Sequence, residues 1–347
     1  MRFDIARMAA SGANQATDFR GVLMKLIIQI PCLNEEESLP HALSFLPRSV
    51  PGFDKVEWMV INDGSTDATV EVAKRCGVDH IVDFKTNRGL AKAFVAGIER
   101  ALLEGADVIV NTDADNQYNA ADIPELVRPI VERRADFVVG SRPIASIEHF
   151  SPIKKLLQRL GSWVVRFTSG ADVVDAPSGF RAFSREASMR LNVFDSYTYT
   201  LESIIQAGRS GARIISVPIR VNGETRPSRL VRSIPRYVMR SSLSIVRSML
   251  VYRPGLSFFL LGLPPFLLGV ILSTRWLAIY IDGTTRAHVP SLVFAAVALI
   301  AAFLCWLCAI MGELNGINRK LSEDVQFQLR CIRFGLSFGE EKDKYAA

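Results

Sequence analysis

The chain has 347 residues, enough for one large domain or two smaller ones, and 49% of them are hydrophobic. Its formal net charge of +6 is local: residues 226–253 carry seven Arg and no acidic residue, which leaves the remainder at −1. This balance argues against a general nucleic-acid binder and favours contact with one anionic surface at one place.

The N-terminal residues 1–23 are rich in Ala, Ser and Gly and lack the apolar stretch of a signal peptide. We therefore expect a flexible tail there, or a start of translation at Met24. The five Cys residues are odd in number and irregularly spaced, which favours a reducing, cytosolic setting. Cys305 and Cys308 lie in an apolar run, which favours small buried residues over a redox or metal pair.

Residues 24–225 alternate strand-like and helix-like segments. Strands are expected at residues 25–30, 57–61, 80–84, 108–111 and 137–139, and helices at 69–76 and 89–104. This alternation predicts an α/β domain with a mostly parallel sheet. In such sheets, ligands bind beyond the carboxyl ends of the strands.

Three polar clusters stand at predicted strand ends: Pro31-Cys-Leu-Asn34-Glu35, Asn62-Asp63-Gly64-Ser65 and Asp113-Ala-Asp115. The carboxyl ends of parallel strands share one edge, so we expect the clusters to converge there. Mg²⁺ is usually held by one or two carboxylates together with substrate phosphates. The carboxylate pair therefore indicates a site for a nucleotide diphosphate held through a metal.

The basic segment 226–253 places five of its Arg residues at intervals of 3, 4, 4 and 7, which form one stripe on a helix. Apolar residues fill much of the rest. We interpret the segment as an interfacial amphipathic helix, or as two helices broken at Pro235, on the cytoplasmic leaflet. Simple anchoring explains the Arg residues, and some of them gripping a lipid phosphate is compatible with it.

Two apolar runs follow, at residues 254–274 and 289–312, and each is long enough to span a bilayer. Pro264 and Pro265 lie inside the first run and predict a kink. A re-entrant hairpin and a core helix of a soluble fold are the alternatives for that run. The Arg-rich segment precedes the pair, and Arg319 and Lys320 follow it, so the positive-inside rule places both ends in the cytoplasm.

Six short segments occur in one order along the chain: Pro31-Cys-Leu-Asn34-Glu35-Glu36, Asn62-Asp63-Gly64-Ser65-Thr66-Asp67, Asn87-Arg-Gly89 with Gly97, Asp113-Ala-Asp115-Asn-Gln117, Gly140-Ser-Arg142 and Asp175-Ala-Pro-Ser178-Gly-Phe-Arg181. Together they resemble glycosyltransferase family 2. With the two apolar runs, the resemblance covers about residues 25–330 and is strongest for the polyprenyl-phosphate branch. It implies a GT-A fold, which is Rossmann-like with a mostly parallel sheet.

The resemblance implies a nucleotide-sugar site built from Pro31, Asn34, Glu35, Asp63, Asn87, Asp113, Asp115 and Gln117. Asp63 matches the carboxylate that accepts a hydrogen bond from the base; a turn-forming Asp is the alternative. Asp113 matches the ribose and metal-side carboxylate. Asp115 matches the direct ligand of Mg²⁺ or Mn²⁺, and Gln117 adds an oxygen near the ion. Asn62 stands where relatives more often carry Asp, so the base preference stays open.

The resemblance also implies an acceptor-phosphate site at Arg142, Ser178, Arg181, Arg226 and Arg229, and a catalytic set of Asp175, Asp115, Arg142 and Arg181. Asp175 acts there as a base or as an orienting residue for Arg181. Arg142 and Arg181 suit bidentate phosphate pairing, with a surface ion pair as the alternative. Glu202 matches a recurrent acidic position, or is a helix-surface residue.

The function expected from the resemblance is inverting transfer of a hexose from a UDP- or GDP-sugar to undecaprenyl or dolichyl phosphate. A family 2 transferase that uses a sugar or another hydroxyl acceptor is the alternative enzyme. A membrane-tethered nucleotide-sugar binder is the alternative without catalysis.

The predicted organisation is a tail (1–23), a GT-A domain (24–225), interfacial helices (226–253), a transmembrane hairpin (254–312) and a cytoplasmic C-terminal helix or tail (313–347). The expected location is a membrane, the bacterial inner membrane above all. The catalytic domain and both termini are expected to be cytoplasmic. The expected partners are the donor, the lipid acceptor and the bilayer, with no nucleic acid; homo-oligomers occur among relatives.

Overall fold

The computed structural model describes residues 23–143, 162–163, 165–167, 169–193, 199–222, 239, 243, 246–247, 249–281 and 289–334. Arg226 and Arg229 lie outside these residues, as do most of the predicted interfacial segment and almost all of the predicted N-terminal tail.

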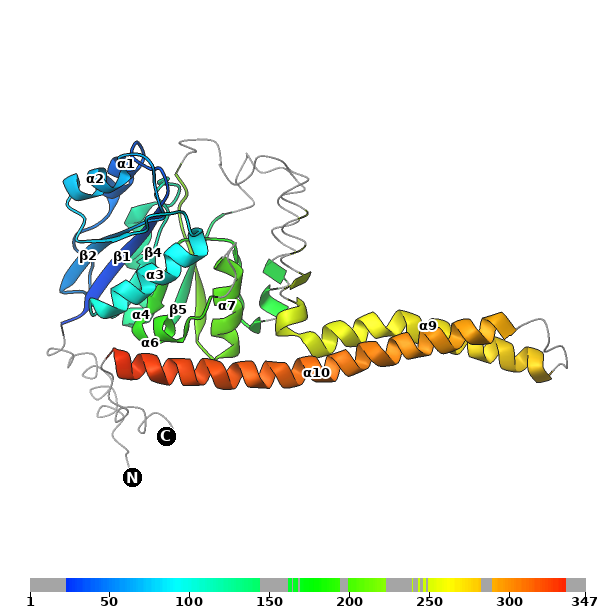
Figure 1. Cartoon of the computed structure of the whole chain (residues 1–347). Coiled ribbons are helices and arrows are strands. Elements are labelled where there is room, and N and C mark those ends of the chain that lie inside the picture. The colour runs from blue at the N-terminus through cyan, green and yellow to red at the C-terminus, as the bar shows by residue number, and fades with distance from the viewer. Residues whose placement is uncertain are drawn as a thin grey trace, which may run out of the picture.

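The catalytic part is built on one seven-stranded sheet with the order β3-β2-β1-β4-β6-β5-β7 (Figure 1). Its strands are β1 (Lys25–Cys32), β2 (Lys55–Asn62), β3 (His80–Asp83), β4 (Val108–Asn111), β5 (Phe137–Ser141), β6 (Arg181–Ser184) and β7 (Ile214–Pro218). The five strands predicted from the sequence are confirmed with small shifts at their ends. Their parallel pairing brings the ends of β1, β2 and β4 to one edge.

The strand β6 was not predicted, and it is the antiparallel member of the sheet. It pairs with β4 on one side and with β5 on the other. It has only four residues and begins with a charged side chain, so it carries no periodic apolar signal that a sequence pattern reveals. The sheet is therefore mostly parallel, as predicted, with one inserted antiparallel strand.

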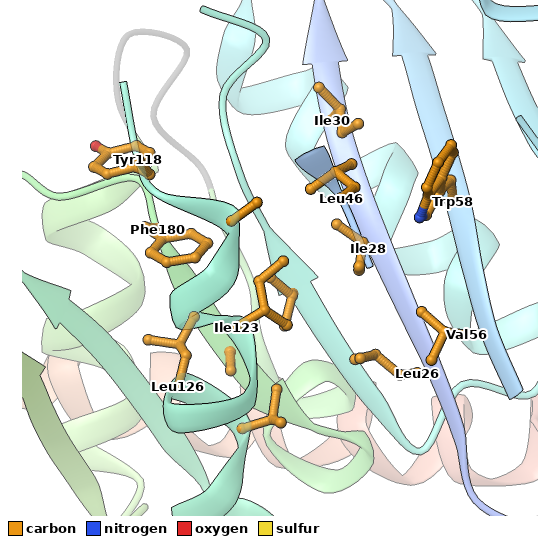
Figure 2. Packing of buried hydrophobic residues seen from close by; sticks show 14 of the residues in the cluster. Leu26, Ile28, Ile30, Leu46, Val56, Trp58, Tyr118, Ile123, Leu126 and Phe180 are labelled. Atoms are coloured by element: carbon orange, nitrogen blue, oxygen red, sulfur yellow. The ribbon is translucent and has the colours of Figure 1, made fainter. Parts of the chain in front are cut away.

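Helices cover both faces of the sheet: α1 (Leu39–Phe45), α2 (Thr69–Arg75), α3 (Leu90–Leu103), α4 (Ile123–Val131), α6 (Arg185–Arg190) and α7 (Thr200–Arg209), with a 3₁₀ turn η2 (Ala120–Asp122) before α4. Alternate residues of β1 enter separate core layers, since Leu26, Ile28 and Ile30 pack on one side and Ile27 on the other. Figure 2 shows the first layer closing against Ile123 of α4.

Two long helices leave this domain as a hairpin, α9 (Pro254–Ile281) and α10 (Val289–Arg333) (Figure 1). Both are long and apolar enough to cross a membrane, and only 11% and 17% of their most apolar windows is buried inside the chain. That exposure disfavours a soluble core helix. Pro264 and Pro265 lie within a single helix, so the described chain does not re-enter at that point.

Close packing of small residues holds the hairpin together. A Cβ atom on Gly262 would lie 2.6 Å from Trp306 Nε1, and one on Gly269 would lie 2.7 Å from Leu299 Cγ. Ala295 and Ala302 are buried in the same contact. Small residues that let two helices approach closely are typical of packing inside membranes.

Candidate active site

Hydrogen bonds join two loops at the edge of the sheet. The Asn34 amide donates to Ser65 Oγ at 2.9 Å, and the Thr66 amide donates back to Asn34 Oδ1 at 2.8 Å. Asn34 has a positive φ of 54°, which turns the chain after β1. The Glu35 amide donates to Thr69 Oγ1 at 2.9 Å. The loop after β1 is therefore held by the loop after β2.

Asp63 orders the next loop. Its two carboxylate oxygens accept the amides of Arg88 at 2.7 Å and Gly89 at 3.0 Å. Gly64 has φ +74°, and a Cβ atom there would lie 2.5 Å from the Asn87 nitrogen. The structure thus gives Asp63 a loop-holding role. Its predicted contact with a nucleotide base stays a prediction.

The Asp113-Ala-Asp115 pair lies at the exit of β4, as predicted. The Asp113 carboxylate packs against Gly179, where a Cβ atom would lie 3.0 and 3.2 Å from its two oxygens. Burial, and then the charge of Asp115, raise the pKa of Asp113 to about 7 although two Arg charges oppose the rise. Asp115 Oδ1 accepts the Gln117 amide at 3.1 Å, which fixes the turn between them.

A cavity of about 630 Å³ lies between these loops and the β4 exit. The side chains that line it are Asn34, Glu35, Glu36, Glu37, Ser38, His41, Thr66, Asp67, Asp115 and Asn116. Asn34, Glu35 and Asp115 were predicted site residues. The other lining residues were not predicted as site residues, although four of them belong to the six ordered segments of the sequence: Glu36, Thr66, Asp67 and Asn116.

The lining is strongly acidic, because five of its side chains are carboxylates. An anionic diphosphate would be repelled by such a surface unless a cation lay between them. Among the described residues, no group of three or more His, Cys, Asp and Glu side chains is placed to hold a metal by itself. Carboxylates such as those of this lining are the ligands that Mg²⁺ takes together with substrate phosphates.

Arg142 and Asp175 form a buried bidentate ion pair. Arg142 Nε donates to Asp175 Oδ2 at 2.7 Å, and Nη2 donates to Oδ1 at 3.0 Å. The Arg142 amide donates to Oδ2 as well, at 3.2 Å. The side chains are 9% and 0% exposed, so neither belongs to a surface ion pair. Both oxygens of the Asp175 carboxylate thus bind Arg142.

Arg181 differs from its predicted role as an acceptor contact. It is fully buried, and its guanidinium donates to the carbonyls of Ala176, Ser178 and Thr200 at 2.6–2.8 Å and to a Ser203 hydroxyl at 2.6 Å. These bonds join residues 175–181 to α7 and keep the guanidinium buried. Arg181 is a structural cation beneath the site.

Ser178, also predicted as an acceptor contact, is fully buried. Its hydroxyl has no hydrogen-bond partner within the described part of the chain. Glu202 lies away from the cavity, since it accepts the Tyr252 hydroxyl at 3.1 Å where the chain enters α9. Within residues 175–181, Asp175 thus binds Arg142 and Arg181 binds backbone carbonyls, while the predicted acceptor role of Ser178 stays a prediction.

Two tyrosines that the sequence did not single out position Gly179. Its amide donates to the Tyr118 hydroxyl at 2.9 Å, and its carbonyl accepts Asn111 Nδ2 at 2.9 Å. The same Asn111 nitrogen donates to the Tyr199 hydroxyl at 2.9 Å. Both hydroxyls are buried, and their contacts fix the backbone against which Asp113 rests. The role of these two tyrosines is visible only from the three-dimensional contacts.

Comparison with known proteins agrees with this geometry. Residues 27–191 match the domain described as glycosyl transferase family 2. An undecaprenyl-phosphate mannosyltransferase of Micrococcus luteus is 32% identical over 56% of this chain and 83% of its own length. A UDP-N-acetylglucosamine–dolichyl-phosphate N-acetylglucosaminyltransferase of Methanococcus voltae is 29% identical over 55% of this chain and 83% of its own length.

A solved structure shares the fold. It is glucosyl-3-phosphoglycerate synthase of Mycobacterium tuberculosis, in complex with Mn²⁺, UDP and glucosyl-3-phosphoglycerate. The TM-score is 0.50 at 22% identity, over 64% of this chain and 80% of that one. The likeness at this identity concerns the arrangement of the sheet and its helices.

Proposed function

Because this chain belongs to glycosyltransferase family 2, we propose that it transfers a hexose from a nucleotide sugar to a polyprenyl phosphate at the cytoplasmic face of a membrane. The observation that carries the proposal is the acidic cavity beside Asp115, in a chain whose C-terminal helices can cross a membrane. Relatives named for undecaprenyl and dolichyl phosphates support the same acceptor class.

The chemistry of the donor set supports a divalent cation, Mg²⁺ or Mn²⁺. Asp113 and Asp115 would hold it, and when bound it would neutralise charge on the leaving diphosphate. Burial is the main cause of the raised pKa of Asp113 and the charge of Asp115 the second, and an ion bound between the two carboxylates would oppose both effects. Asn34 and Glu35 line the cavity from the opposite loop and would contact the nucleotide.

The reaction proceeds in this proposal by one displacement. An oxygen of the acceptor phosphate bonds to C1 of the hexose while the bond from C1 to the diphosphate oxygen breaks, which inverts the anomeric centre. A phosphate monoester has a second pKa of about 6, so the attacking phosphate oxygen is already anionic and needs no strong base. Asp175 therefore serves as a positioning residue that aims Arg142 at the acceptor anion.

The orientation follows from charge at the ends of the hairpin. The Arg-rich segment 226–253 precedes α9, and Arg319 and Lys320 follow the second apolar run, residues 289–312. The positive-inside rule then places the catalytic domain and both chain ends in the cytoplasm. A polyprenyl phosphate in the same leaflet would meet the site from the membrane plane.

Transfer assays run in parallel with different acceptors test the acceptor class. Full-length protein in liposomes receives a radiolabelled UDP- or GDP-sugar with undecaprenyl phosphate, dolichyl phosphate or 3-phosphoglycerate. The proposal predicts label that partitions into organic solvent with a polyprenyl phosphate. Label transferred to 3-phosphoglycerate, separated from the unreacted nucleotide sugar, with no label on a polyprenyl phosphate would favour the hydroxyl-acceptor alternative and contradict the proposal.

A further inference from the structure

The turn that carries Asp115 is paired with a short segment that follows β7. Residues 220–222 run antiparallel to residues 117–119, with a bridge between Tyr118 and Val221. A backbone hydrogen bond closes this pairing at each end, one of 2.9 Å and one of 3.3 Å. The segment after β7 therefore belongs to the same local structure as the carboxylate pair.

An ion pair anchors the first residue of this segment. The Arg220 guanidinium donates to Asp122 Oδ1 through Nε at 2.8 Å and through Nη2 at 2.6 Å, and the Arg220 amide donates to Oδ2 at 2.6 Å. Asp122 is only 7% exposed and lies in the 3₁₀ turn η2. These contacts do not involve the side chain of Asn222, so a substitution there leaves the segment anchored.

The Asn222 side chain contacts the turn directly. Its Nδ2 donates to the Asn116 carbonyl at 2.9 Å, and because a carbonyl oxygen only accepts, the contacting atom must be the amide nitrogen. Asn116 has a positive φ of 54°. Asn tolerates this backbone conformation better than most residues, but it persists only where the surroundings support it. The side chain of Asn222 provides such support.

One peptide unit links Asn222 to Asp115. The Asn116 carbonyl accepts Asn222 Nδ2, and the N–H of the same planar unit, which belongs to Gln117, donates to Asp115 Oδ1 at 3.1 Å. In a trans peptide the C=O and N–H groups point in opposite directions, so fixing the carbonyl also fixes the direction of the N–H. A hydrogen bond to the carbonyl also polarises the unit and strengthens the bond that its N–H donates.

We propose that Asn222 is a positioning residue that orients the Asp115 carboxylate for binding a divalent cation. The inference rests on the proposed role of Asp115 as a ligand of that ion. Without the Asn222 amide, the peptide unit between residues 116 and 117 would rotate, and Asp115 would lose the N–H that fixes its Oδ1. The ion would then have to order the turn as it binds, which lowers its affinity. Asn222 lies outside the six ordered segments, so the sequence did not single it out.

Mn²⁺ titrations of the full-length protein, followed by electron paramagnetic resonance, test the inference. Asn222→Ala removes the donor, and Asn222→Asp replaces it with an oxygen of similar size that repels the Asn116 carbonyl. We expect about tenfold weaker Mn²⁺ binding in both variants, as is typical when a residue that holds a metal ligand is lost. Asn222→Asp is the sharper test, because its new negative charge alone would strengthen the binding of a cation.

Asn119→Asp is the matched control. The Asn119 side chain lies in the same loop but caps η2, where its Oδ1 accepts the Ala121 amide at 3.0 Å. A carboxylate at this position still accepts that amide, and it adds the same charge as Asn222→Asp. We expect Mn²⁺ binding at least as tight as in the parent chain. Equal weakening in the two Asp variants, or parent-like affinity in both Asn222 variants, would overturn the inference.

The dependence of transfer on Mn²⁺ concentration separates positioning from loss of structure. In Asn222→Ala, we expect the Mn²⁺ concentration for half-maximal transfer to rise about tenfold. The rate at saturating Mn²⁺ should stay within about twofold of the parent rate, because the bound ion then holds Asp115 itself. A rate that stays low at every Mn²⁺ concentration would overturn the inference. A parent chain that binds no Mn²⁺ would overturn the proposed metal role together with the inference, and this result differs from equal binding by all variants.

Discussion

Among single residues, the close contact between Gly179 and the Asp113 carboxylate is important for the site. In Gly179→Ala, the new Cβ would lie 3.0 Å from a carboxylate oxygen that is already packed, so the carboxylate must move. We expect about tenfold weaker Mn²⁺ binding, measured directly by electron paramagnetic resonance. Gly316→Ala is the control, because nothing lies within 4 Å of its Cβ position. Equal Mn²⁺ affinity in the two variants would contradict the proposed role of Asp113.

The Arg142–Asp175 pair gives a second prediction at this scale. Asp175→Asn leaves a buried cation without its counter-charge, and breaking a buried pair in this way costs about 3–5 kcal/mol of unfolding free energy. Thermal unfolding should detect the loss, while Asp172→Asn, whose side chain is 88% exposed, should change little.

The same variant separates the two roles considered for Asp175. If Asp175 positions Arg142, transfer falls in Asp175→Asn but its pH profile keeps its shape. A general base would instead give a rate that rises with pH in the parent chain and loses that dependence in the variant. The second pattern would contradict the positioning role.

The sequence alone indicated which residue types gather at the site, and the structure shows which of them face it. Asp113 and Asp115 were placed at a strand exit by the apolar run before them, and that placement is confirmed. The burial of Arg181 could not be predicted in the same way, because a sequence motif gives the identity of a residue but not its exposure to solvent. Its burial depends on the carbonyls of Ala176 and Thr200, which come from different segments.

At the scale of elements, Glu57 ties three strands together. It pairs with Lys25 of β1 at 3.2 Å and with His80 of β3 at 2.9 Å, and it also contacts Lys55 on its own strand. Burial raises the pKa of Glu57, but hydrogen bonds from these three side chains outweigh it and lower the pKa to about 2. The ionised carboxylate is therefore favoured in the folded chain.

The lowered pKa has a direct consequence for acid stability. The folded value lies below the unfolded value of about 4.3, so the stabilisation is complete above that pH and is lost as pH falls toward about 2. Glu57→Gln should remove about 2–3 kcal/mol at neutral pH, and the difference from the parent chain should vanish near pH 2. Denaturation at several pH values measures this, with Glu132→Gln, 45% exposed, as the control. A difference that persists at pH 2 would contradict the ionic explanation.

Strands with a strong apolar pattern could be predicted from the sequence. Strands that form because of tertiary contacts could not. The strands β1, β2 and β4 are mostly apolar, with Gln29 and Glu57 as buried exceptions, and such sequences are typical of parallel strands covered on both faces. The strand β6 has four residues and is strand-like because β4 and β5 flank it. The unbroken course of α10 through Glu313 was hidden by the change from apolar to mixed composition.

In the whole molecule, the long helix α10 joins the α/β domain to the apolar hairpin. The described part of α10 contacts the catalytic domain through α6 and enters the hairpin beside the start of α9. Tyr252, just before α9, bonds to Glu202 of α7 at the same junction. If the hairpin crosses a membrane as proposed, these contacts would hold the site at a fixed distance from the bilayer, which suits an acceptor that reaches the site from the membrane plane.

In the proposed reaction, the carboxylate pair and a divalent ion bring a nucleotide sugar to a lipid phosphate. The most direct measurement is organic-extractable label formed from a labelled nucleotide sugar and undecaprenyl phosphate by the full-length chain in liposomes with Mn²⁺. We predict label from the parent chain, loss after EDTA with recovery on adding Mn²⁺, and loss in Asp115→Asn but not in Asp172→Asn. Label that survives in Asp115→Asn, or no extractable label with any UDP- or GDP-sugar, would contradict the account.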